Sequence, residues 1–194
     1  MEELEAQVRD ELSAITVFLE ERLGRRSRWN GEVELSDEAA AFGKARWSGG
    51  IIINRALARS ELRWRTEIHE LLHTFSPGLV ISDYLSLPGW EEGVVEQLQR
   101  LLRPSILARL AVSVPEDVFA PVEAGHEYNR YITALEKLRV VLNTPYEAFY
   151  QELLATPLKD RPNATIQQGR RLPADQFRGF QREFALAFSI LRGD

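Results

Sequence analysis

The chain has 194 residues, of which 44% are apolar and 27% charged, and its formal net charge at pH 7 is −5. These values are typical of a globular protein with a sizeable core, and so mild an acidic balance gives no reason to expect a nucleic acid or a membrane as partner. The chain has no cysteine, which excludes disulfides, thiolate catalysis and cysteine-ligated zinc. Any zinc site must therefore use histidine, aspartate and glutamate.

Apolar periodicity and turn signals predict the elements in chain order. The first part of the chain is expected to contain a helix over 3–23, a strand over 31–35, a hairpin over 42–54 and a helix over 61–75 capped by Ser60. The second part is expected to contain an ordered loop over 78–89, helices over 90–102 (ending before Pro104), 105–112, 126–142 and 145–155, a loop over 156–163 and a last helix over 173–192. The sequence therefore predicts the α+β class, mostly helical with a small antiparallel sheet.

The organisation and location of the chain are also predicted from these patterns. We expect one domain over 1–194, with a subdomain over about 1–76 that holds the sheet and a helical subdomain over about 77–194. The first residues lack the basic start and apolar run of a secretory signal. No stretch approaches the roughly eighteen apolar residues of a membrane span, so a cytoplasmic protein is expected.

Two of the three histidines, His69 and His73, stand four residues apart in the helix expected over 61–75. On a helix this spacing places both rings on one face, within reach of one zinc ion. Glu70 lies on the neighbouring flank, where a carboxylate can take a proton from a zinc-activated water. Large apolar residues occupy the opposite face, so the helix can be buried behind its histidines. This is the His-Glu-x-x-His pattern of zinc hydrolases.

A catalytic zinc takes a third protein ligand and leaves one position open. His126 is distant in the sequence, whereas Glu92 follows His73 after the interval 74–91 and stands in the first turn of the next helix. We therefore expect Glu92 to be the third ligand. Glu91 is its rival, and the alternative explanation of Glu91 is an acid favoured by the dipole at a helix amino terminus.

The segment HELLH, followed after the interval 74–91 by EGVVE, resembles the gluzincin metallopeptidases, and the short chain resembles their small single-domain members. GGIIIN is similar to the zincin edge strand, which pairs with an extended substrate. The resemblance covers about residues 42–100. It implies a zincin-like fold, with the sheet packed on the histidine helix, and Zn²⁺ as cofactor. The implied zinc ligands are His69, His73 and Glu92, with Glu70 as general base and Glu96 as hydrogen-bond partner of His69.

A hydrolase of this type also needs a hydrogen-bond donor that faces the developing oxyanion. The resemblance points to a tyrosine or histidine from a later helix, and the segment GHEYNRY supplies His126, Tyr128 and Tyr131. Tyr131 is in register with Leu135 and is therefore expected in the core. This favours Tyr128 as the donor, with His126 next.

The sequence thus predicts a zinc metallopeptidase, with endopeptidase action favoured because no terminus-binding motif is visible. Its substrate, a peptide or protein, would lie along the strand over 51–54, and a regulatory partner is expected to restrain it. Two alternatives stay open, namely an inactive zinc-binding fold that serves as a binding or regulatory module and a metal-free helical scaffold with a chance motif.

The basic run over 25–28 is expected to be a solvated turn. The stripe expected in the core of the last helix, or alternatively on a partner-binding face, comprises Phe177, Phe180, Phe184, Phe188 and Leu191.

Overall fold

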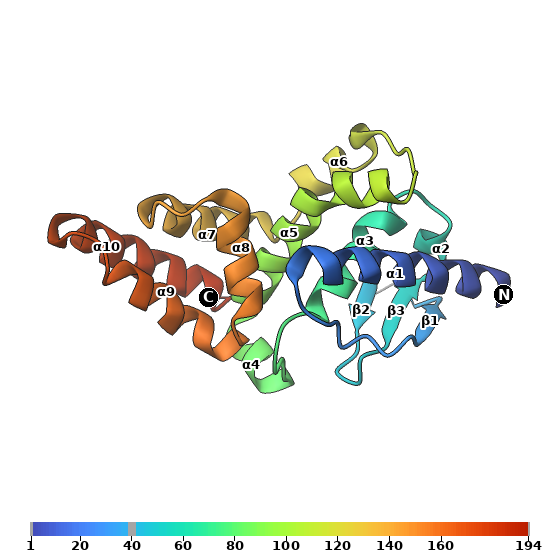
Figure 1. The fold of residues 1–194 in the computed structure, drawn as a ribbon, viewed down its shortest axis with the longest axis horizontal. Coiled ribbons are helices and arrows are strands. Elements are labelled where there is room, and N and C mark those ends of the chain that lie inside the picture. Colours follow the sequence, from blue (N-terminus) through green and yellow to red (C-terminus); the bar gives the residue numbers. More distant parts are fainter. Residues whose placement is uncertain (1, 39–41, 194) are drawn as a thin grey trace. The chain divides into compact units, whose positions relative to one another are not determined.

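The computed structural model describes residues 2–38 and 42–193, which are mostly helical and include one three-stranded sheet (Figure 1). This confirms the α+β class. The contacts divide the chain into two compact units, Met1–Phe75 with Gln99–Ala124 and Ser76–Leu98 with Gly125–Asp194. The organisation as one metallopeptidase-like domain stays a prediction. None of the described helices is long and apolar enough to cross a membrane.

The first unit is built on a sheet covered by two helices. Its elements are α1 (Glu2–Leu23), β1 (Val33–Ser36), β2 (Gly43–Ala45), β3 (Ile51–Asn54), α2 (Arg55–Ala58), α3 (Arg63–His73), the part of α5 (Pro88–Arg109) from Gln99 on, η1 (Glu116–Val118) and α6 (Ala120–Ala124). Helix α1 buries Val8, Leu12 and Ile15, which recur at helical spacing. Both α1 and α3 pack against strands and against each other, so the expected packing of the sheet on the histidine helix is observed.

The sheet has the order β1-β3-β2, and it is mixed. The hairpin expected over 42–54 is confirmed, because β2 and β3 pair antiparallel. The expectation of a wholly antiparallel sheet is wrong, since β1 pairs parallel with β3, with Val33 opposite Ile51. The end of β1 and the start of β2 both lie beside the end of β3, with Ser36 opposite Asn54 and Gly43 opposite Ile53.

This order also corrects the expected place of the substrate. Strand β3, over 51–54, is the central strand and is paired on both sides. Its backbone groups are already used by β1 and β2, and it cannot accept a third strand. The edge strands are β1 and β2, and β2 is the one that packs against α3.

The start of the histidine helix differs from the expectation. The Asn54 side chain accepts hydrogen bonds from the backbone of Ala56 and Leu57 and opens the additional short helix α2. The Ser60 hydroxyl donates to the Leu57 carbonyl at 2.8 Å and does not cap α3, which begins at Arg63 without a side-chain cap. The sequence therefore indicated the helix correctly and its cap wrongly.

The second unit is helical. Its elements are α4 (Ile81–Ser86), the part of α5 up to Leu98, α7 (Asn129–Val141), α8 (Tyr146–Ala155), η2 (Leu158–Asp160), α9 (Arg161–Gly169) and α10 (Ala174–Leu191). Two expected loops are thus partly helical, because 78–89 contains α4 and 156–163 contains η2 and the start of α9. Helix α10 packs along α7. In the phenylalanine stripe Phe180 and Leu191 are buried, and the other members are half-buried.

Helix α5 continues through Pro104 to Arg109, where the sequence predicted two separate helices. A proline inside a helix removes one backbone hydrogen bond and costs about 3 kcal/mol. The burial of Leu102 and Ile106 on either side of Pro104 helps to offset this cost.

Earlier in α5, a Cβ atom at Gly93 would lie 2.9 Å from side-chain atoms of Tyr131 and Leu135. The glycine of EGVVE therefore allows α7 to approach closely, and Tyr131 is buried as expected.

Candidate metal centre

The last turn of α3 directs two ring nitrogens at one point. The Nε2 atoms of His69 and His73 lie 3.2 Å apart, and both side chains are buried. Two nitrogens bound to one tetrahedral zinc at about 2.0–2.1 Å are separated by about 3.3 Å. The observed separation therefore fits two ligands of one metal ion, which would require each ring proton to be on Nδ1.

The carboxyl end of α3 is held by the basic segment after α1. Arg28 donates to the His73 carbonyl at 3.4 Å, and Arg25 donates to the Phe75 carbonyl at 3.2 Å. The carbonyls at the end of a helix lack partners within the helix and carry partial negative charge, so arginine suits this position. The expected solvated turn is confirmed in part, because Arg26 and Arg28 are exposed, but Arg25 and Arg28 also donate to the carbonyls at the end of the segment that carries the histidines.

The structure brings Glu92 to the two histidines. One ligand atom from each of His69, His73 and Glu92 lies within 4.8 Å of the other two, and all three residues are buried. Two imidazoles and one carboxylate form a donor set suited to a divalent first-row metal, and a catalytic zinc commonly has it. The group therefore meets the distance and donor requirements of a metal site.

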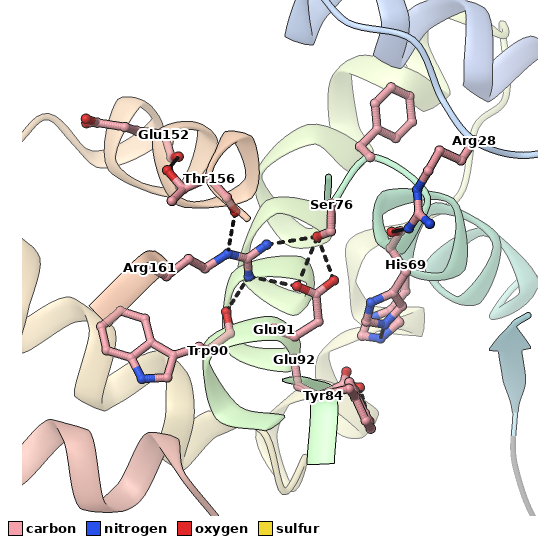
Figure 2. A network of polar contacts seen from close by, with 12 residues as sticks. Arg28, His69, Ser76, Tyr84, Trp90, Glu91, Glu92, Glu152, Thr156 and Arg161 are labelled. Carbon is pink, nitrogen blue, oxygen red and sulfur yellow. Dashed lines mark hydrogen bonds and ion pairs between the residues drawn. The ribbon is translucent and has the colours of Figure 1, made fainter. Parts of the chain in front are cut away.

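Tyr84, on the short helix α4, is a site residue that the sequence did not single out. Its hydroxyl donates to Oε1 of Glu92 at 2.6 Å, and Figure 2 shows the two side chains together. A tyrosine inside an expected loop has no periodic pattern to mark it, so this contact could not be found from spacing.

The Glu91 carboxylate is bound by other residues and is not part of the metal group. Its carboxylate accepts from the Ser76 hydroxyl at 2.7 Å and pairs with Arg161 at 2.7 Å. Among the described residues, the group with ligand atoms in reach of one another contains Glu92 and not Glu91. Of these two glutamates, Glu92 is the one with a carboxylate oxygen within reach of both histidines.

Glu70 is buried, and its contact with strand β2 defines its position. The backbone N–H of Ala45 donates to Glu70 Oε2 at 2.7 Å. A Cβ atom at Gly43 would lie 2.6 Å from Thr66 Cγ2 and 3.1 Å from Glu70 Oε1. Glycine at 43 therefore allows the edge strand to come close enough to hold the carboxylate.

The structure also locates the predicted hydrogen-bond partner of His69 and the two predicted oxyanion donors. Glu96 is fully buried on α5, one turn beyond Glu92. Tyr128 precedes α7, and its ring stacks on Tyr131 with centroids 5.9 Å apart and meets His126 edge-on at 4.7 Å. The hydrogen bond from His69 to Glu96 and the oxyanion role of Tyr128 or His126 stay predictions.

Comparison with models of protein families, with curated proteins and with solved structures found no match to this chain. The gluzincin resemblance therefore rests on the motif residues and on the geometry of His69, His73 and Glu92.

Proposed function

We propose that the chain is a zinc-dependent peptidase of gluzincin type that acts as an endopeptidase. The observation that carries the proposal is the grouping of His69, His73 and Glu92 within 4.8 Å, with Glu70 next to the first ligand on the same helix. Zinc is preferred because two imidazoles and one carboxylate are its usual ligands in hydrolases. When bound, it would polarise the scissile carbonyl and lower the pKa of its water.

Glu70 is the proposed proton carrier. Its carboxylate would take the proton of the attacking water and pass it to the leaving amine. The Ala45 N–H binds only one of its oxygens, Oε2, so the strand holds the side chain by one oxygen while Oε1 can receive the proton.

The proposal extends to the oxyanion donor and the substrate. Tyr128 and His126 stay the candidate donors, because the Tyr84 hydroxyl gives its one proton to the proposed zinc ligand Glu92 at 2.6 Å. The edge strand β2 replaces β3 as the strand to which an extended peptide can pair. A regulatory partner and a cytoplasmic location remain predictions from the sequence.

Hydrolysis of a peptide library by the wild type and by Glu70→Gln tests this function. The wild type is expected to cleave internal bonds, and Glu70→Gln to keep its zinc and lose at least about a hundredfold in rate, because the amide cannot accept the proton. Glu61→Gln, an exposed position just before the same helix, is the matched control and should keep full activity.

Two results would contradict the proposal. Equal turnover by the wild type and Glu70→Gln would refute the role of Glu70 as base. Stoichiometric zinc without turnover in any variant would refute the peptidase and favour a zinc-containing binding module.

A further inference from the structure

A fully buried ion pair lies directly behind the proposed third zinc ligand. Arg161, the first residue of α9, and Glu91, the residue before Glu92, are both completely inaccessible, and Arg161 Nη1 lies 2.7 Å from Glu91 Oε2. Neither residue belongs to the metal group, and the peptidase proposal assigns a role to neither.

Every nitrogen of the Arg161 guanidinium has an acceptor. Nη1 also donates to the Trp90 carbonyl at 2.6 Å, Nε to the Thr156 carbonyl at 3.1 Å, and Nη2 to the Ser76 hydroxyl oxygen at 2.8 Å. The Ser76 hydroxyl in turn donates to Glu91. Figure 2 shows the guanidinium directed at these groups. The network therefore ties the segment after α3 and the end of α8 to the first turn of α5.

Stability alone explains this arrangement poorly. Burying two charges is costly, and apolar residues of similar volume often hold such a position equally well. The planar guanidinium has fixed donor directions, however, and so specifies the orientation of the several groups that it binds. Here it holds the backbone of Trp90 and the side chain of Glu91, two successive residues of one helical turn.

Fixing these two residues also fixes the direction of the next one. Successive side chains on a helix differ by about 100° in direction, so a small rotation of this turn would move the Glu92 carboxylate away from its partners. Tyr84 holds the Glu92 carboxylate itself at 2.6 Å. Glu92 is thus oriented from its backbone by Arg161 and at its carboxylate by Tyr84.

We propose that Ser76, Glu91 and Arg161 form a positioning network that orients Glu92 for metal binding. The inference rests on the proposed zinc site, and its distinct content is that residues without contact to the metal set the metal affinity. Outer hydrogen-bond partners of metal ligands typically change affinity by tenfold to a hundredfold.

The test uses Ser76→Ala and Glu91→Gln, both of which leave the Arg161 side chain in place. Zinc affinity is measured by competition with a chromogenic chelator, and ligand geometry by the visible absorption of the cobalt-substituted protein. Each variant is expected to bind zinc about tenfold to a hundredfold more weakly and to show a shifted cobalt spectrum.

The control is Glu123→Gln, which weakens the pair of another buried arginine, that of Arg103 with the half-buried Glu123. It should lower the thermal unfolding midpoint by an amount comparable to Ser76→Ala but leave the zinc affinity and the cobalt spectrum unchanged. A purely structural network would instead make all three variants behave alike.

The outcomes separate this inference from the function on which it rests. If folded Ser76→Ala and Glu91→Gln bind zinc as tightly as the wild type with the same cobalt spectrum, the positioning network is refuted and the zinc site stands. If the wild type binds no zinc, the proposed function fails and the inference fails with it.

Discussion

Glu67, two residues before His69 on α3, is a fully buried acid that lies beside the carboxylate of Glu11. Burial first, and the neighbouring Glu11 carboxylate second, raise the pKa of Glu67 well above its usual value, while Arg63 opposes the shift. The folded protein therefore holds a proton that the unfolded chain releases at lower pH. Stability from this group is complete below the ordinary pKa of glutamate and is lost as the pH rises through the raised pKa.

Replacing Glu67 by glutamine removes this titration. We expect Glu67→Gln to gain stability relative to the wild type as the pH rises above the ordinary pKa of glutamate, by about 1.4 kcal/mol for each pH unit until the raised pKa is reached. Urea unfolding at a series of pH values, with chelator present so that metal binding does not contribute, measures the difference. A difference independent of pH would contradict the burial of an ionisable Glu67, and Glu127→Gln at an exposed position is the control.

The contact between strand β2 and helix α3 depends on the absence of a side chain at Gly43, where a Cβ atom would lie 2.6 Å from Thr66 Cγ2. We expect Gly43→Ala to lower stability by about 1–3 kcal/mol, because crowding must move the strand or the helix. The same movement would lengthen the hydrogen bond from Ala45 to Glu70 and lower the rate of peptide hydrolysis. Thermal unfolding and turnover measure the two effects.

Gly179→Ala on α10 provides the matched substitution for this prediction. A Cβ atom there meets no other atom within 4 Å, and alanine is the better helix former by about 1 kcal/mol. This variant should be slightly more stable than the wild type and equally active. If Gly43→Ala behaved in the same way, the close approach of β2 and α3 would not constrain the site.

The elements predicted best from the sequence are those whose pattern is local. The periodicity of residues 61–75 indicated α3, and the spacing of its histidines placed both rings on one face. Helix α4 is too short for such a pattern, so the contact of Tyr84 with Glu92 was missed. The pairing of β1 with β3 and the order of the strands depend on contacts that alternation of residues does not encode.

At the scale of the whole molecule, the sequence predicted that Glu92 of one helix lies close to the two histidines of another. Glu91 and Glu92 are neighbouring acids in one helical turn, and both the interval after His73 and the resemblance favoured Glu92. In the structure Glu91 pairs with Arg161, a residue in an expected loop far along the chain, whereas an oxygen of Glu92 lies within reach of the two histidines. No local signal connects Glu91 with Arg161, so this difference between the two glutamates could not be predicted from the sequence.

The zinc content of protein purified without added metal tests the central claim most directly. The wild type and the exposed control Glu127→Ala should carry close to one zinc per chain, whereas His73→Ala and Glu92→Ala should lose most of it, because each removes one of three protein ligands. Less than about 0.2 zinc per wild-type chain, with no uptake when zinc is titrated in, would contradict a metal site of this kind.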